Sequence, residues 1–343
     1  MLLERQLGDP GNTDLSVRNI DVFKQGSGLI VPDFATPYSV HVNAGVQREL
    51  ATRLVATADF VYRRSVRQNM GDVDLNRWLA VQGPVIPACR GPELLDPRAQ
   101  CSTGPVTVQM SGGLATYKGL LVKLERRWSG RYQMLGSYAL SSNRGFNGVT
   151  NNNDWFESFG PRDMDRRHVF TFSGIADLPW GLRLSAVSKV LSGPPFRAQL
   201  FGLDLNGDGT INDILPGTGW NELGRGVDAG SLREAIERFN SGPAGGLTPA
   251  GRPTPRVTLP TSFTFGDSVF SQDLRIAKIF RFSDHYELNV FGEVFNLLNV
   301  ANLDGYGVNL LEPSTFGQPN RRATQVFGSG GPRAFQFGGR ISF

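Results

Sequence analysis

The 343-residue sequence predicts an all-β fold made of long antiparallel strands, and three observations support this prediction. Apolar and polar residues alternate along segments of about ten residues or more, which is the period of a strand with two different faces. The connections between these segments alternate between short and long. Glycine supplies 42 residues, about 12% of the chain against a usual ~7%, and apolar residues only 40%, so we expect many turns and few helices.

Seven segments carry the alternation most clearly. They are residues 53–63, 118–127, 131–141, 167–178, 181–190, 286–295 and 332–343. In the second of these, the apolar residues at even positions share one face, and the charged residues Lys123, Glu125 and Arg127 share the other. Glu287 and Glu293 occupy the polar face of a later segment in the same way. With the less regular segments included, we predict about ten to twelve strands.

The connections between the strands indicate which kind of β protein this is. Short links lie at residues 49–52, 128–131, 177–181 and 283–285, and long polar loops lie at roughly 65–112, 143–165, 193–266 and 298–332. A soluble sandwich has no reason to keep every second loop long. Transmembrane β-barrels combine strands of about nine to eleven residues with short turns on one side and long loops on the other. We therefore predict an antiparallel outer-membrane β-barrel with long extracellular loops.

One of the long loops is expected to carry a short helix at residues 231–242. Ser231 and Glu234 have the spacing of a capping box, in which each side chain bonds the backbone of the other. The apolar residues at 232, 235, 236 and 239 would form one stripe. We expect this stripe to pack on the body of the loop itself.

The segment DLNGDGTIND begins like a calcium loop. Its oxygen-bearing candidates are Asp204, Asn206, Asp208 and Asp213. Gly209 stands at the position of the sharp turn, but the twelfth position is a leucine where an EF-hand has its bidentate glutamate. Two interpretations stay open. These four residues hold calcium in a looser loop, or the Asp, Asn and Gly residues form turns that order the loop without a metal.

The two cysteines, Cys89 and Cys101, lie together in a segment rich in proline and glycine. Two thiols in one polar loop, with none elsewhere, suggest a disulfide formed outside the cytosol. The alternative is a pair of unpaired thiols.

Several function classes find no support in the sequence. A net charge of +4 without a basic run argues against nucleic-acid binding. Nucleophile-elbow, zinc-protease and phosphate-loop motifs are absent, so we do not expect an enzyme. His168 lies beside Asp165, Arg166 and Arg167, and we interpret this group as an ion-pair network. The charged residues at 123, 125, 127, 287 and 293 would line a hydrated lumen or contact a ligand there.

The chain ends on the alternating strand PRAFQFGGRISF. This strand and the segments DMDRRHVFTFSGIADLPWG, DLNGDG, DLRIAKIFRF and ELNVFGEVFNLLNVANL occur in an order that resembles the C-terminal barrel portion of TonB-dependent outer-membrane receptors. The resemblance covers approximately residues 30 to 343 and is closest to the Oar-like group, which has a carboxypeptidase-regulatory-like N-terminal domain. The resemblance implies that the outer-membrane assembly machinery recognises the terminal residue, Phe343.

The resemblance also implies a location, partners and a function. Residues 1–343 would be the C-terminal segment of a receptor barrel in the outer membrane of a Gram-negative bacterium, with no plug domain and no signal peptide. They would make roughly half of a large barrel. The expected partners are lipid, the assembly machinery and the missing plug and strands, and TonB only through the missing part. The expected function is uptake of a siderophore, an oligosaccharide or a peptide. The alternative from another class is a secreted, calcium-stabilised β-rich adhesin or binding module.

Overall fold

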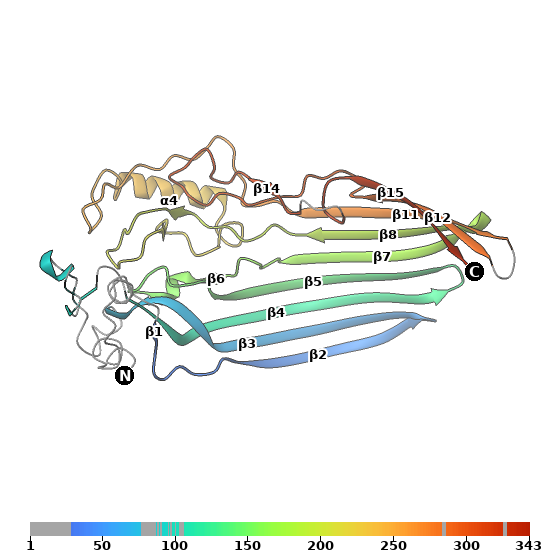
Figure 1. The fold of residues 1–343 in the computed structure, drawn as a ribbon, viewed down its shortest axis with the longest axis horizontal. Helices are drawn as coiled ribbons and strands as arrows, with labels where there is room; N and C mark the ends of the chain where they lie inside the picture. The colour runs from blue at the N-terminus through green and yellow to red at the C-terminus, as the bar shows by residue number, and fades with distance from the viewer. Residues whose placement is uncertain are drawn as a thin grey trace.

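The computed structural model describes residues 29–76, 87, 89, 91–94, 96, 98–99, 101–102, 106–282, 286–324 and 328–343. Its main feature is one antiparallel sheet of long strands that lie side by side (Figure 1). The long strands are β2 (Tyr38–Ala51), β3 (Leu54–Asp74), β4 (Thr107–Ser129), β5 (Tyr132–Phe146), β7 (His168–Leu178), β8 (Leu182–Leu191), β11 (Val269–Arg281), β12 (Glu287–Phe295) and β15 (Ala334–Ser342). This confirms the predicted all-β antiparallel fold.

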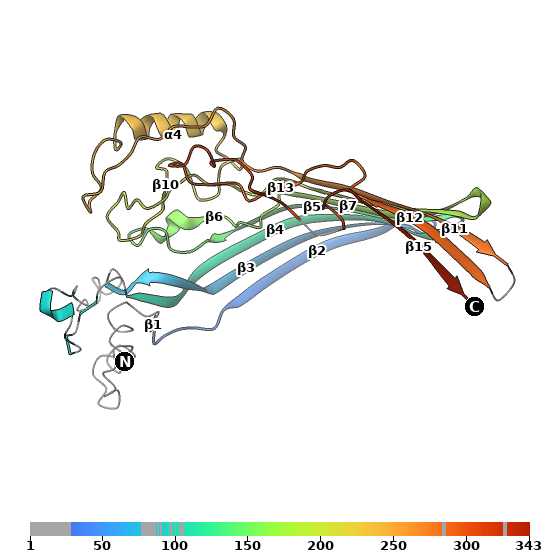
Figure 2. The same cartoon turned by 45° about the horizontal axis from the view of Figure 1, so that its top comes forward.

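Each long strand pairs with the long strands before and after it in the chain. The sheet order is β15-β12-β11-β8-β7-β5-β4-β3-β2, and two short strands complete a total of eleven. Strand β1 (Leu29–Ile30) pairs with β4 in parallel, and β6 (Phe159–Pro161) pairs with β5. Among the described residues no pairing joins β2 to β15, so these two strands form the edges of a curved sheet (Figure 2).

The register keeps the alternation of neighbouring strands in step. Val122 of β4 lies opposite Ala58 of β3 and Tyr138 of β5, while Lys123 lies opposite Thr57 and Ser137. Because side chains point to opposite faces at successive positions, this register gathers apolar residues on one face and polar residues on the other. We call these the apolar face and the polar face of the sheet.

The short connections that the structure describes lie at one end of the sheet, and the chain also ends there (Figure 1). Only Thr52 and Arg53 link β2 to β3, and Gly130 and Arg131 link β4 to β5. A 3-10 turn, η3 (Pro179–Gly181), links β7 to β8. Arg53 and Gly130 have positive φ angles of 64° and 67°, which reverse the chain in few residues. The predicted turn at 283–285 lies outside the described residues.

Strands β3 and β4 run further than the sequence predicted. The predicted loop began at about residue 65, but β3 continues to Asp74, and β4 starts at Thr107. The pairing continues past irregularities at Gln68 and Met70, which twist this extension. Apolar side chains on it pack into a small core with Leu29 and Val31 of the N-terminal segment. The alternation was hidden here because the irregularities shift its phase.

The long connections fold into a separate layer at the opposite end. We call it the loop layer and define it as residues 147–167, 192–268 and 296–333, apart from the undescribed residues. It contains η2 (Trp155–Ser158), β6, β9 (Gln199–Leu200), β10 (Asp213–Ile214), α4 (Ala229–Ser241), β13 (Leu303–Asp304) and β14 (Arg321–Arg322). Its core joins the second and third of these loops, with Phe196, Leu223, Leu232, Phe239, Leu310 and Phe316 almost fully buried.

The predicted loop helix is present, but its start was predicted two residues too late. It begins at Ala229, and Asp228 is the N-cap, whose side chain accepts a hydrogen bond from the Ser231 N–H at 2.8 Å. A carboxylate at the N-cap satisfies a free N–H of the first turn, so the capping role falls to Asp228 and not to Ser231. The expected stripe is buried in the layer's own core, as the sequence indicated.

Buried asparagines support the irregular backbone of the loop layer. Asn296 donates to the carbonyls of Val300 and Gly331, and Asn302 donates to the carbonyls of Phe270 and Gly330. Both asparagines have positive φ, near 48° and 47°, which asparagine tolerates better than most residues. Amide side chains thus pair backbone groups that no strand ladder can reach.

Candidate functional site

The apolar face of the sheet is exposed along its whole width. Val46 of β2, Val122 of β4, Ile276 of β11 and Phe337 of β15 stand on it, and their exposures are 66, 38, 56 and 81%. A water-facing sheet of this size would bury such residues, and an exposed apolar area so large marks a membrane or partner contact. Each long strand between the two edge strands satisfies its backbone on both sides inside the sheet, so the face is suited to lipid. In the described residues, no helix has the length and apolarity to cross a membrane.

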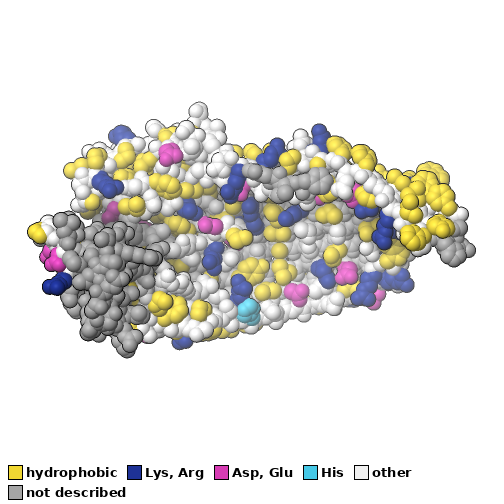
Figure 3. Space-filling view, in the orientation of Figure 1, with side chains coloured by type: hydrophobic (Ala, Val, Ile, Leu, Met, Phe, Trp, Pro, Cys, Tyr) yellow, Lys and Arg dark blue, Asp and Glu magenta, His cyan; other side chains and the backbone are white. Residues whose placement is uncertain are grey.

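Aromatic side chains border the apolar face at the end with the short turns. Tyr132, Trp180, Phe280, Phe282 and Tyr286 are all exposed there. Two of them lie beneath cations: the Arg126 guanidinium is 4.2 Å from the Tyr132 ring centre, and the Lys278 ammonium is 5.6 Å from the Phe280 ring centre. Rings with a polar neighbour suit the boundary between lipid and water. Apolar side chains also gather at this end in Figure 3.

The polar face carries charged side chains of both signs across the sheet (Figure 3). Lys123 and Glu125 pair at 3.1 Å, and the Arg127 guanidinium is 4.0 Å from Glu125. Glu293 pairs with Arg275 at 3.0 Å, and Glu287 pairs with Arg281 at 3.3 Å. The five lumen-facing candidates therefore all lie on this face, but in separate ion pairs. The sequence analysis did not select three arginines of this face: Arg275, Arg281 and Arg183, the last of which pairs with Asp177 at 2.6 Å.

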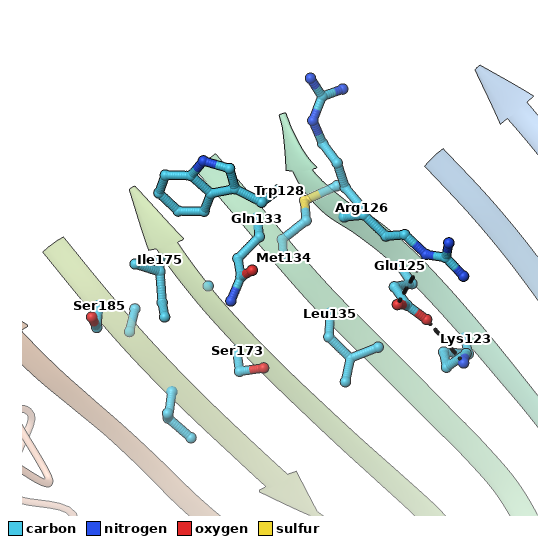
Figure 4. Close-up of a pocket in the computed structure, with 14 residues that line it drawn as sticks. Lys123, Glu125, Arg126, Trp128, Gln133, Met134, Leu135, Ser173, Ile175 and Ser185 are labelled. Atoms are coloured by element: carbon cyan, nitrogen blue, oxygen red, sulfur yellow. Dashed lines mark hydrogen bonds and ion pairs between the residues drawn. The ribbon is translucent and has the colours of Figure 1, made fainter. Parts of the chain in front are cut away.

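A hollow of about 520 Å³ lies on the polar face near the short turns. Strands β4, β5, β7 and β8 each contribute to it (Figure 4). Its lining includes Lys123, Glu125, Gln133, Ser173, Ile175 and Ser185. Figure 4 shows Glu125 turned toward Lys123, with Gln133 beside Trp128. The lining is open and mixed in chemistry, so it offers polar contact without a fixed ligand geometry.

The calcium-like segment forms a tight, self-bonded loop. One Asp204 oxygen accepts the Gly207 and Asp208 N–H groups at 2.6 and 3.1 Å, and the other accepts the Gly209 N–H at 2.9 Å. Asp208 is fully buried and accepts the N–H and hydroxyl of Thr210 and the N–H of Asn152. These bonds account for the turn without a metal. In the described ranges, no three His, Cys, Asp or Glu side chains are already arranged to hold a metal ion.

Asp213 differs from the other three candidates. It is only 4% exposed, one of its oxygens accepts the Leu205 N–H at 2.7 Å, and the described residues offer no partner to the other, Oδ1. Burial raises its pKa to about 7, and the nearby negative charges of Asp208, Asp204 and Glu157 add to the rise. Burial also raises the pKa of Glu157. The loop layer therefore contains a crowded acidic group.

A pocket of about 360 Å³ opens beside this acidic group, between two loops. Its aromatic and acidic lining consists of Phe156, Phe159, Trp220, Glu157, Asp213 and Glu222. Glu222 is neutralised by Arg144 of β5 at 2.6 Å. Sequence reasoning missed the contribution of the 147–167 loop. The one signal for it was the Asp154 and Glu157 pair in a segment rich in asparagine.

The remaining candidates, the two cysteines and the charged group at residues 165–168, make contacts that stabilise the fold. Cys89 and Cys101 form a disulfide, with their Cα atoms 4.9 Å apart. His168 Nδ1 lies 2.7 Å from the Tyr138 hydroxyl. Buried Asp165 accepts the Asn143 N–H at 2.7 Å and lies 3.6 Å from the Arg225 guanidinium. Through these hydrogen bonds and this ion pair, the charged group at 165–168 connects β5 and β7 to the loop layer.

Comparison with solved structures finds long outer-membrane proteins. The Ferric-Catecholate import receptor Fiu from K12 E. coli matches with a TM-score of 0.46 and 11% identity, over 93% of this chain and 30% of its own. The outer membrane transporter YddB from Escherichia coli gives 0.47 and 12%, over 93 and 34%. The FrpB iron transporter from Neisseria meningitidis gives 0.43 and 10%, over 92 and 33%. The chain thus spans about a third of the length of these structures.

The family comparison covers almost the whole chain. No curated protein sequence matches it. The model of the outer membrane beta barrel domain matches residues 10–336. This agrees with the exposed apolar face, the aromatic border and the alternation of short turns and long loops. The chain therefore belongs to the outer-membrane β-barrel domain family, and its place is the outer membrane of the cell.

Proposed function

We propose that this chain contributes wall strands and extracellular loops to a TonB-dependent receptor that takes up a ligand across the outer membrane. The observation that carries the proposal is that one chain contains both a sheet and a loop layer with different surfaces. A sheet with a lipid-compatible exterior and a charged interior is joined, at one end only, to a folded layer of long loops. The sheet is suited to form the wall of a pore, and the loop layer is suited to form a surface that binds a ligand. The sequence resemblance to such receptors supports the same conclusion.

The orientation follows from the connections. In outer-membrane barrels the short turns face the periplasm and the long loops face outward. The loop layer would then meet the ligand first. The disulfide between Cys89 and Cys101 would lie on the outer, oxidising side. Phe343, which is 95% exposed at the end of the last strand, would be the residue that the assembly machinery reads.

The polar face would line a hydrated lumen. Its selected charges are already in ion pairs, Lys123 and Arg127 with Glu125, and the two glutamates with Arg281 and Arg275, so we assign Lys123, Glu125, Arg127, Glu287 and Glu293 to the lining and not to a specific ligand site. The ligand classes that such receptors handle are siderophores, oligosaccharides and peptides. In our proposal the loop layer determines which of these ligand classes the receptor binds.

The chain would work together with a plug and further strands. Edge strands β2 and β15 present unpaired backbone groups, which cost several kcal/mol each in lipid, so they require neighbours. TonB would act through the plug and not through this chain. A secreted adhesin is the weaker alternative, because it would expose the whole apolar face to water.

The test compares two forms of the protein in cells. A signal peptide fused to residues 1–343 should give little stable outer-membrane protein, whereas the gene product with an upstream plug and strands should assemble. Deleting Phe343 from the longer product should reduce assembly. Uptake of a labelled ferric catecholate, an oligosaccharide or a peptide by the longer product should require TonB. Stable insertion and TonB-dependent uptake by the fused chain alone would refute the proposal, and so would a freely soluble monomer.

A further inference from the structure

The apolar face of the sheet carries cations but no acid. Its positions are the even-numbered residues of the long strands from β2 to β12 and the odd-numbered residues of β15. In the regularly paired parts of these strands, no such position holds aspartate or glutamate. The cations at these positions are Arg48, Arg64, Lys118, Arg126, Arg144 and Lys278. The polar face, by contrast, mixes both signs and pairs them.

On β4 the outward cations stand at the two ends of the apolar band. Lys118 and Arg126 are eight residues apart, which is about 26 Å along a strand. Only Leu120, Val122 and Leu124 lie between them on the same face. With the tilt of about 35–45° usual in outer-membrane barrels, this length corresponds to ~20 Å of height, close to the ~25 Å of their apolar band. Lys118 therefore stands at one boundary of the lipid interior, and Arg126 at the other.

Arg64 and Lys118 mark the boundary nearer the loop layer. Lys118 faces Ser142 of β5, two residues beyond the point where β5 meets His168, the first residue of β7. Arg64 faces Val40, the third residue of β2. At this level the shorter strands of the sheet have therefore given way to loops.

Arg64 and Lys118 are neighbours without a counter-charge. Lys118 lies directly opposite Tyr62 of β3, and Arg64 is the next residue of β3 on the same face. Such diagonal neighbours on paired strands are about 7–8 Å apart, within reach of long side chains. Both residues are exposed, and neither forms an ion pair with another described residue. Two like charges side by side favour an anion that can contact both.

Three of the other four outward cations already have partners. Arg126 lies over the Tyr132 ring, Arg144 pairs with Glu222 of the loop layer, and Lys278 donates to the Trp180 carbonyl. The fourth, Arg48, stands on the edge strand β2, next to the place of a missing strand. The pair at Arg64 and Lys118 is thus set apart by its position inside the sheet and by its unmatched charge.

We propose that Arg64 and Lys118 bind the phosphate of a membrane lipid in the leaflet on the side of the loop layer. Arginine offers a planar fork of N–H donors that matches phosphate oxygens, and lysine adds a compact charge. A lipid fits better than an acidic protein segment, because its acyl chains can lie along the apolar band that begins at Leu120. In the orientation proposed above, on which this step rests, the leaflet is the outer one.

Lipid binding can be measured on the intact receptor in detergent by native mass spectrometry. The probes are dioleoyl phosphatidic acid and dioleoylglycerol, which differ only in the phosphate, and we expect the first to bind much more tightly. Arg64→Gln and Lys118→Gln should each weaken binding of the tightest phosphatidic acid by about tenfold or more, corresponding to ~1.4 kcal/mol. Arg64→Lys and Lys118→Arg keep the charge and should stay within about threefold of the wild type.

The matched control is Arg63→Gln, which removes the same charge one residue away on the polar face and should leave binding within about twofold. Equal weakening by this control, or equal binding of dioleoylglycerol, would overturn the proposal. Displacement of the lipid by inorganic phosphate, or tighter binding of a poly-glutamate peptide, would also overturn it, since the ligand would then not be a lipid. Both Gln variants should keep TonB-dependent uptake, and a wild type without such uptake would refute the proposed function but not the lipid site.

Discussion

The sheet and the loop layer place their apolar side chains in opposite ways. In the sheet, large apolar residues such as Val46 and Phe337 point outward and are mostly exposed, while charged residues share the other face. In the loop layer, Leu223, Leu232 and Phe316 are completely buried, and polar residues cover them. The same physical rule produces both patterns, because apolar surface avoids water in each case. The difference teaches that the two regions have different solvents, lipid for the sheet and water for the loops.

Polar groups show the same contrast. The sheet satisfies its backbone through strand ladders and keeps its charges in pairs on one face. The loop layer has short ladders only, so side chains such as Asn296 and Asn302 bond its backbone, at the Gly331 and Gly330 carbonyls. A strand ladder requires no particular side chain, whereas these asparagines are specific. We therefore expect the sheet to tolerate exchanges among apolar residues, and the loop layer to be sensitive to single changes.

The largest effect should come from a core truncation in the loop layer. Phe316→Ala leaves a cavity where the ring contacts Phe196 and Phe263, and should cost about 3–5 kcal/mol. Phe60→Ala on the apolar face leaves no cavity, and should cost only about 1.5–3 kcal/mol from the lost transfer of the side chain into lipid. Urea unfolding of the intact receptor from lipid vesicles measures both. Equal costs would remove the distinction between a packed core and a lipid-facing surface.

A charge placed on either face of the sheet should give the next largest effect. Val122→Arg puts a cation into lipid near the middle of β4 and should destabilise the protein by about 2–4 kcal/mol. Ser137→Arg, on the polar face of the neighbouring strand, should change stability by less than about 0.5 kcal/mol. The same vesicle unfolding experiment compares them. A larger cost for Ser137→Arg would mean that the two faces have been assigned the wrong way round.

Removing the disulfide should have a local effect on the loop between β3 and β4. The Cys89–Cys101 bridge closes a short loop, which corresponds to about 2–3 kcal/mol of local order in the chain-entropy model. The double Cys→Ser variant should lose protease resistance in this loop, while the sheet keeps its stability. Mass spectrometry without reduction should find the two peptides linked in exported protein. Two free thiols there would contradict the outward placement of this loop.

The smallest effect should follow loss of the helix cap. The Ser231 N–H bonds Asp228 and holds the pKa of that carboxyl below its ordinary value, so the folded state favours the charged form. Its contribution is present above the ordinary carboxyl pKa and is lost as pH falls through the lowered one. Asp228→Ala should speed hydrogen exchange in the first turn of α4 at neutral pH and remove this acid dependence. Ser241→Ala, at the other end of α4, is the matched control.

The sheet was predictable from the sequence because its signals are periodic. Alternation fixed the faces of β4 and β12, and loop lengths fixed which end carries the turns. The prediction failed where the period was interrupted, as in the extension of β3 beyond Gln68. The helix start was misjudged because Ser231 and Asp228 both suit a cap, and only the backbone geometry decides between them.

The acidic group of the loop layer was only half predictable. Asp204, Asn206, Asp208 and Asp213 have a recognisable spacing within one loop. Glu157 lies 56 residues before Asp213 in the chain, and nothing in a sequence pattern links two residues from different loops. The roles within the motif were also hidden, because hydrogen bonds to Asp204 and Asp208 form only when the loop folds.

The most direct test of the central claim measures which solvent each face of the sheet meets. Nitroxide labels at Val122→Cys and Lys123→Cys, placed singly in the intact receptor in lipid vesicles, report their access to oxygen and to a water-soluble nickel chelate. The native cysteines are joined in the disulfide and do not take the label. Position 122 should favour oxygen and position 123 the nickel chelate, with the alternation continuing along residues 119–125. Equal access at both positions, or the reverse order, would contradict the lipid-facing wall.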